Sequence, residues 1–425
     1  MRNTLIAFVV TFAVALPVVA LVARHDDGRA LAPLALPPGP LPNESTDAQI
    51  RGLQATVRAA PGRADGYTLL SSAYLQKVRE TGDAGYYQRA AAAVSRALIL
   101  SPSDPAALTQ RSAVELSRHD FRAGLADAQR ARALAPAVNK PFGVLVDALV
   151  ELGRYDDAGR ALQQMVNRHP DLAAYARVSY FRELHGNLPG AVRAMRRAVS
   201  AGGEVPENDA YVRTLLGNLE LQRGDLVAAR RAFGGALVSL PGYVPAVAGM
   251  AKVDVARGRL PAAIARLRDA VTRLPLPEYV IALAEAEHVA GRRVAAARDL
   301  DLVRVEERLL ARSGVNTDVD TALFEADHGS PQKAVALARR AWAAAPSVRA
   351  ADALGWALTR AGDARAALPW AAWALHLGSR DPAFNLHAAL AARAAGLGGL
   401  ARARLAVARA GRFALPAQAQ REALR

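Results

Sequence analysis

The chain has 425 residues, a formal net charge of +15 and no cysteine. The lack of cysteine excludes disulfides, thiolate catalysis, cysteine metal sites and lipoprotein-type anchoring. Apolar residues make up 52% of the sequence and aromatic residues only 5%, a composition that favours an elongated helical protein over several separate globules.

The N-terminal segment predicts export. Residues 4–23 carry no charge, and a charged cluster begins at Arg24. A helix of this length can cross a bilayer about 30 Å thick. Pro17 and the small residues that follow it would also suit a cleaved signal peptide. We expect residues 1–27 to be either a membrane anchor, which we favour, or a signal peptide, with the body of the chain periplasmic or otherwise extracytoplasmic in both cases.

Residues 28–45 are rich in proline and predict a semi-rigid linker. Residues 46–63 predict a lone amphipathic helix ending at Pro61, which would cap the first repeat of the region that follows. At the other end, residues 413–425 predict a C-terminal cap or tail, with a short polar helix at 416–424.

Between these ends the sequence repeats. Eight glycines are each followed five residues later by alanine, and the spacing between successive glycines stays near 34. The pairs are Gly153/Ala158, Gly186/Ala191, Gly224/Ala229, Gly258/Ala263, Gly291/Ala296, Gly329/Ala334, Gly362/Ala367 and Gly396/Ala401. In six of the eight units a second alanine follows seven residues after the first, while Met165 and Val303 take that place in the other two. The pattern predicts pairs of helices joined by a glycine turn, with alanines where the two helices cross.

Several units depart from the frame. The first carries an extra stretch, residues 78–88, before its second helix is expected to resume at Ala90, and the second has His119 where the turn glycine should be. Two spacings stretch to about 38, through an insertion at 200–209 and a longer charged helix at 298–314. We interpret both as tolerated growth of the repeat, or as insertions that help to build a binding face.

The segments 149–162, 215–241 and 352–375 resemble tetratricopeptide repeats. The best unit carries the consensus residues in order: Leu216, Gly217, Gly224, Ala229, Phe233, Ala236 and Pro241. The resemblance covers about residues 64–412 and implies an all-α, right-handed superhelical solenoid of about ten helix–turn–helix repeats. It implies protein binding in general but no particular partner.

In this family the first helix of each repeat lines a concave groove that binds an extended or helical peptide. The resemblance places six candidate ligand contacts in that groove: Arg177, Tyr180, Tyr211, Asn218, Lys252 and Trp356. The family's paired asparagine and basic residues, which clamp a C-terminal carboxylate, have only isolated counterparts here. Tyr180 and Trp356 are either ligand contacts or packing residues, and Trp370 and Trp373 are expected to fill the core between repeats.

Arginine supplies almost all the positive charge, a bias that a GC-rich genome also produces. On the repeat frame many arginines fall on second helices and so on the convex face: Arg193, Arg196, Arg197, Arg230, Arg231, Arg266, Arg268, Arg339 and Arg340. Such a face would suit an anionic lipid surface or envelope polymer. Nucleic acid is a poorer partner, because no recognition motif is present.

The sequence contains no phosphate-binding loop, nucleophile elbow, zinc-protease motif or EF-hand loop. We therefore expect a chain that is not an enzyme and has no cofactor or metal site. Two functions remain open: a cell-envelope scaffold that binds a protein segment in the groove to assist assembly of a larger complex, and an accessory subunit of envelope polymer synthesis or export that uses the convex arginines.

Overall fold

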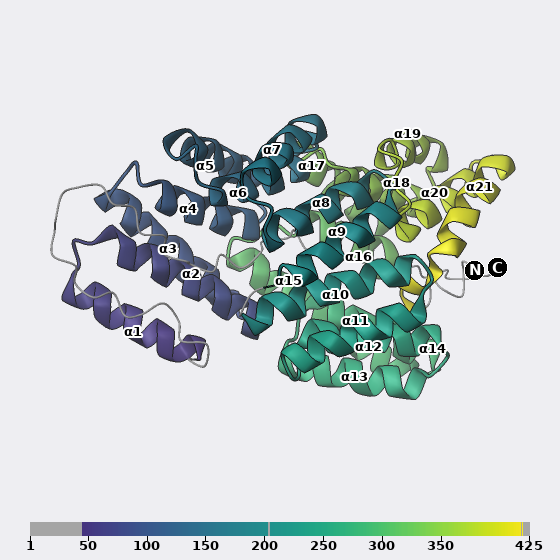
Figure 1. Ribbon diagram of the computed structural model, residues 1–425. Helices are drawn as coiled ribbons and strands as arrows, with labels where there is room; N and C mark the ends of the chain where they lie inside the picture. Colours follow the sequence, from purple (N-terminus) through teal and green to yellow (C-terminus); the bar gives the residue numbers. More distant parts are fainter. Residues whose placement is uncertain (1–44, 203–204, 418, 420–425) are drawn as a thin grey trace. The chain divides into compact units, whose positions relative to one another are not determined.

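A computed structural model describes residues 45–202, 205–417 and 419, and every regular element in these ranges is helical (Figure 1). The helices are α1 (Thr46–Ala59), α2 (Ala64–Thr81), α3 (Gly85–Leu100), α4 (Pro105–Ser117), α5 (Phe121–Leu134), α6 (Lys140–Glu151), α7 (Tyr155–Arg168), α8 (Leu172–Leu184), α9 (Leu188–Ser200), α10 (Pro206–Gln222), α11 (Leu226–Ser239), α12 (Val244–Ala256), α13 (Leu260–Arg273), α14 (Pro277–Val289), α15 (Arg293–Arg312), α16 (Asp318–His328), α17 (Pro331–Ala344), α18 (Val348–Arg360), α19 (Ala364–Ala374), α20 (Pro382–Ala394), α21 (Gly398–Ala410) and the short 3-10 helix η1 (Arg412–Ala414).

Helices α2 to α21 form ten successive pairs, which confirms the predicted all-α repeat solenoid. The described residues divide into a smaller compact unit, 45–148 with 313–315, and a larger one, 149–312 with the residues from 316 onward. The expected anchor at 1–27 and almost all of the linker lie outside the described residues. Among the residues that the structure describes, no helix is both long and apolar enough to cross a membrane.

The repeated alanines are buried where the two helices of a repeat cross, as the sequence predicts. All eight first alanines are buried, six of them completely, and so are the second alanines with Met165 and Val303. Small side chains at these positions allow the two helices of a repeat to approach closely, and a larger side chain would overpack the contact.

Phe233 shows how large and small residues fit together within the stack. Its ring is fully buried on α11, between a glycine of α10 and a glycine of α12. A Cβ atom at Gly217 would lie 2.5 Å from the ring, and one at Gly249 would lie 2.3 Å from it. Three consecutive helices therefore pack around one aromatic side chain, and this arrangement requires both glycines.

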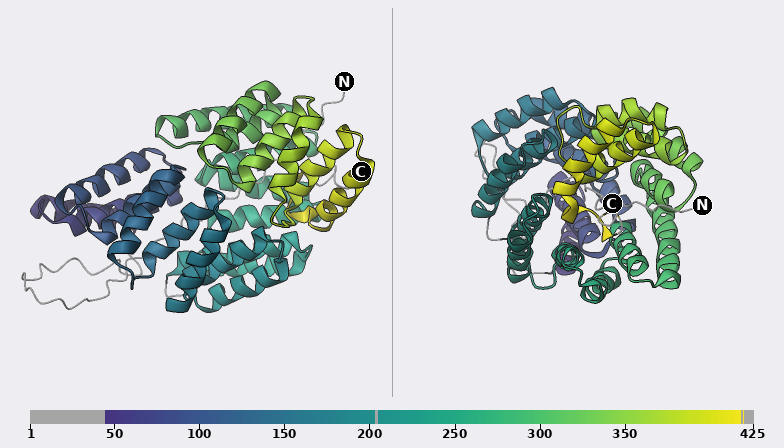
Figure 2. Two further views of the ribbon diagram at one scale, coloured as in Figure 1. Left: turned by 90° about the horizontal axis from the view of Figure 1, so that it is seen from above. Right: turned by 90° about the vertical axis from the view of Figure 1, so that its right-hand side faces the viewer.

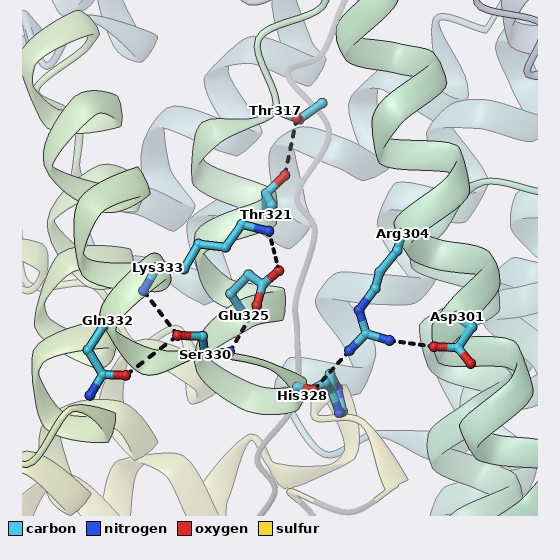
Figure 3. Close-up of polar contacts among 9 residues, drawn as sticks. All are labelled: Asp301, Arg304, Thr317, Thr321, Glu325, His328, Ser330, Gln332 and Lys333. Carbon is cyan, nitrogen blue, oxygen red and sulfur yellow. Dashed lines mark hydrogen bonds and ion pairs between the residues drawn. The ribbon is translucent and has the colours of Figure 1, made fainter.

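Seven of the eight predicted turn glycines adopt left-handed backbone angles, with φ between 69° and 90°. Gly329 is the exception, with φ of −139°. Here Glu325 holds the turn instead: its carboxylate accepts hydrogen bonds from the Ser330 backbone N–H at 2.9 Å and from Lys333 Nζ at 2.6 Å (Figure 3). The carboxylate also fills the space beside Gly329, because a Cβ there would lie 2.0 Å from Glu325 Oε2.

The smaller unit departs from the regular repeat at two places. His119 does replace the turn glycine, and it adopts the left-handed conformation itself, with φ of 60°. The extra stretch before Ala90 is mostly helical, because α2 continues to Thr81 and α3 already begins at Gly85. In the larger unit the predicted long charged helix is present as the 20-residue α15.

The larger unit curls back on itself, so that its last repeats lie beside its first ones (Figures 1 and 2). The turn at Gly153 faces the Pro346 carbonyl after α17, and the turn at Gly186 faces the Gly378 carbonyl after α19. A Cβ atom at either glycine would lie only 2.2 Å or 2.1 Å from the facing oxygen. We call this line of contact between turns about 190 residues apart in sequence the seam.

The C-terminal segment extends the seam. Gly411 lies against the Gln222 carbonyl at the end of α10, while Phe413 and Ala414 pack on the core formed by Leu221 and Phe233. The predicted C-terminal tail thus contacts repeats in the middle of the sequence. The polar helix expected at 416–424 lies mostly outside the described residues.

Candidate ligand-binding interior

Charged and polar side chains from the first helices of successive repeats converge within the larger unit. We call six of them the inner belt: Glu151, Tyr180, Lys252, Glu278, Asp320 and Arg349. They belong to α6, α8, α12, α14, α16 and α18. Residues far apart in the sequence therefore share one electrostatic environment.

Arg349 is the centre of this belt. Its Nη2 atom donates to Asp320 Oδ1 at 3.2 Å, and Glu151 and Tyr180 also interact with its charge. Burial works to lower the pKa of Arg349, but the surrounding acidic groups, Asp320 foremost, raise it overall. The guanidinium thus remains charged at every physiological pH.

Lys252 and Glu278, on the first helices of neighbouring repeats, influence one another's ionisation. Burial lowers the pKa of Lys252, although Glu278 opposes the shift. Burial also raises the pKa of Glu278 to about 8, with a further contribution from Asp320 and a partial offset from Lys252. Both residues are only half-buried. Water therefore still reaches the Lys252 amine and the Glu278 carboxylate, although burial disfavours the charged form of each. A ligand that contributes complementary polar groups would stabilise those charged forms.

The predicted groove residues on α8 and α10 have different environments. Arg177 is buried and its guanidinium donates to the Ala173 carbonyl of its own helix at 3.2 Å. Tyr180 belongs to the belt, and burial raises the pKa of its hydroxyl far above the usual value. Tyr211 and Asn218 are half-buried on α10. Of the six predicted contacts, the structure brings Tyr180 and Lys252 into the belt.

Trp356, which the sequence leaves open as a ligand contact or a packing residue, has the surroundings of a packing residue. It is 2% exposed, its Nε1 donates to Asp327 Oδ1 at 2.9 Å, and its ring stacks on His387 with 4.4 Å between centroids. His387 in turn contacts Asp352 Oδ2 at 2.9 Å. Trp356 therefore packs inside the stack, because α16 and α20 cover both sides of it. Trp370 and Trp373 are only partly buried and make edge-to-face contacts with Trp342.

Sequence reasoning missed four of the six belt residues: Glu151, Glu278, Asp320 and Arg349. Three of them stand at the second or third residue of their helix. This helical position could have indicated Glu278 and Arg349. In the family that the sequence resembles, the second residue of a repeat's first helix faces the groove. Nothing in the sequence could have indicated that the charges of Glu151 and Arg349 interact, because their proximity depends on the seam.

The convex arginines are less available than the sequence suggested. Arg196 pairs with Glu220 at 2.9 Å and Arg266 with Asp254 at 2.9 Å, and both carboxylates are buried. Arg268 likewise pairs with the buried Glu287, and Arg340 with Asp318. These four of the nine arginines neutralise acids of the repeat stack. The remaining five, Arg193, Arg197, Arg230, Arg231 and Arg339, are exposed.

The described residues contain no group of acidic and histidine side chains arranged to hold a metal ion. The combined geometry of ten helix pairs, left-handed turns and buried alanines decides the fold. The chain has a tetratricopeptide-type repeat fold.

No family model matches the sequence of this tetratricopeptide-type solenoid, and no curated protein matches it. Among solved structures it is similar to a tetratricopeptide repeat protein from Parabacteroides merdae, with 15% identity over 54% of this chain and 86% of that one and a TM-score of 0.41. It is also similar to a human IFIT1 dimer with m7Gppp-AAAA, with 13% identity over 78% and 77% of the two chains and a TM-score of 0.49. A third similar structure is the APC/C hetero-tetramer Cut9-Hcn1, with 14% identity over 89% and 93% and a TM-score of 0.31. Identity and TM-score at this level carry no argument about ligands.

Proposed function

We propose that the chain is a non-catalytic interaction scaffold of the cell envelope, which holds a peptide or protein segment along the inner belt and so assists assembly of a larger complex. The repeat fold supports a protein-interaction scaffold in general. The more specific proposal rests on one observation: half-buried side chains of opposite charge converge from several helices, and burial disfavours the charged forms of Lys252 and Glu278.

A polypeptide segment suits this interior for a physical reason. Its backbone N–H and C=O groups and its side chains can supply donors and acceptors to several repeats at once. Each contact returns a polar partner to a group that burial has partly dehydrated, which favours binding without one dominant anchor. The envelope location is supported by the apolar segment at 4–23 and remains part of the proposal.

The alternative role, binding of an envelope polymer or anionic lipid through the convex face, has weaker support. Four of the nine convex arginines already pair with carboxylates of the stack. Those pairs satisfy buried or half-buried acids, and a polyanion would have to compete for arginines that the fold uses. The five exposed arginines are what this role would depend on.

Site-specific photocrosslinking in cells tests the proposal. A photoreactive amino acid replaces Tyr211 or Asn218 on the inner side, and Arg231 or Val238 on the outer side, where Val238 is 83% exposed. We expect discrete protein adducts from the inner positions, which mass spectrometry can map to one segment, and none from the outer ones. Adducts from the outer positions alone, or capture that weakens steeply with salt, would replace this proposal with the polymer or lipid role.

A further inference from the structure

The seam joins two parts of the larger unit through contacts between turns and around the buried ring of Tyr155. Within each repeat, helices pack through completely buried alanines and rings such as Phe233. Across the seam, the backbone at Gly153 meets the backbone at Pro346, and that at Gly186 meets Gly378. Backbone contacts of this kind bury little apolar area, so they contribute little of the hydrophobic free energy that holds the stack together.

A hydrogen bond from Val348 to Tyr155 crosses the seam. Val348 is the first residue of α18, and a backbone N–H at this position has no acceptor inside its own helix. The hydroxyl of Tyr155, at the start of α7, accepts that N–H at 2.8 Å. The tyrosine ring also lies 5.9 Å from that of His376. Opening of the seam would exchange this bond for one to water, at little cost.

Acidic groups face each other near the same line. Glu183, three residues before Gly186, accepts a hydrogen bond from Gln222 Nε2 at 2.5 Å, and Asp381, three residues after Gly378, lies close enough to disfavour its ionisation. Burial is the main reason why the pKa of Glu183 rises to about 7. Across the seam Asp381 thus opposes ionisation of Glu183, whereas Arg349 attracts Glu151.

The C-terminal segment adds a further apolar contact to the seam. Phe413 and Ala414 of η1 pack on the core of α10, α11 and α12, although their own helix pair, α20 and α21, belongs to the last repeat. A single exchangeable aromatic contact on a separate short segment can act as a latch, because its removal leaves the repeat interfaces themselves intact.

We propose that the seam is a gate: the larger unit opens between its first and last repeats, with Phe413 as the latch, to admit a segment to the inner belt. The role in loading rests on the proposed function, whereas the opening itself is a property of the chain alone. Opening of the seam and loading of a segment can therefore be tested, and disproved, separately.

Distance measurements test the opening directly. The chain lacks cysteine, so spin labels can be placed on the full chain at H185C and R380C, two exposed positions beside the contact between Gly186 and Gly378. We expect a short distance and a longer one in the wild-type background, with the longer population several-fold larger in Phe413→Ala. The Phe413→Leu variant keeps an apolar latch and should resemble wild type. A control pair at R257C and R292C, on turns away from the seam, should give one distance in every variant.

Hydrogen exchange gives a second measurement if Phe413→Ala folds poorly. Tyr155→Phe keeps the ring but removes the acceptor of the Val348 N–H, and loss of this bond should speed exchange of that amide about tenfold. A single short distance in wild type and Phe413→Ala alike, or an unchanged Val348 exchange rate in Tyr155→Phe, would overturn the gate.

Loading is tested last. A bismaleimide crosslink between H185C and R380C fixes the seam closed. It should abolish photocrosslinking from Asn218 while leaving the helical spectrum unchanged. Adducts that persist in the fixed chain would show that the segment enters without the gate, even where the distance measurements demonstrate opening.

Discussion

Two sets of glycine turns in the larger unit have the same backbone conformation and different surroundings. Gly153 and Gly186 have φ of 70° and 69°, and Gly258 and Gly291 have φ of 73° and 82°. A Cβ atom at the first two would collide with a carbonyl across the seam, whereas at the other two it would meet nothing within 4 Å. One repeat motif therefore meets two requirements. Its glycine forms a left-handed turn in both sets, and at the seam it also allows close backbone contact.

The largest loss of stability should come from a change in the packed interior of the stack. Trp356→Ala should lower the free energy of unfolding by about 3–5 kcal/mol, because it leaves a cavity at a fully packed site. Denaturant unfolding measures this loss, and Trp356→Phe, which keeps most of the volume, should lose less. If Trp356→Ala left stability unchanged, the tryptophan would not be part of the core.

Gly186→Ala should be the most damaging change at a turn. It combines left-handed strain with overlap against the Gly378 carbonyl, and we expect a loss of about 2–5 kcal/mol. The added methyl group would also hold the seam apart, which the spin-label pair would report. A loss no larger than that of Gly258→Ala would remove the distinction between the two kinds of turn.

The pH dependence of stability should contain a contribution from Glu183, which lies beside the seam. The pKa of Glu183 is raised from 4.5 to about 7 by burial, with Asp381 adding to the shift and Gln222 opposing it. The unfolded chain therefore loses this proton first, and the free energy of unfolding falls as pH rises from about 4.5 to 7 and then levels off. Glu183→Gln should reduce that fall, as measured by thermal melts across this range. Parallel melting curves for the two proteins would contradict the assignment.

Gly258→Ala tests the turn conformation alone. With open space around the new methyl group, only the left-handed backbone opposes the change, and we expect a loss of about 1–2 kcal/mol. Thermal unfolding checks the value, and the distance at the seam should not change. A loss equal to that of Gly186→Ala would mean that the seam adds nothing.

His119→Gly should have the smallest effect, and it should be favourable. Glycine relieves the left-handed strain at this turn but increases the entropy of the unfolded chain, so the net gain is about 0.5 kcal/mol. Stacking of His119 on Phe121, with 5.5 Å between centroids, would be lost and limits the gain. A clearly destabilised variant would show that the ring contact outweighs the strain.

The sequence by itself determined the repeat. Glycine every 34 residues or so and alanine at helical spacing are local requirements, set by turn geometry and by the width of a helix crossing. They were sufficient to predict the helix pairs, the buried alanines and the long α15. Gly329 shows the limit of such local reasoning, since a carboxylate four residues earlier replaced the expected turn.

The tertiary structure alone decided the seam and, with it, the inner belt. The contacts of Gly186 with Gly378 and of Glu151 with Arg349 depend on how small rotations between repeats accumulate over about 190 residues. No single repeat encodes that sum. The same cause explains why Tyr180 and Lys252 were predicted as groove residues from their helical positions, while the charges that surround them were not. For Trp356 the sequence left packing and ligand contact open, and the neighbouring helices α16 and α20 decided for packing.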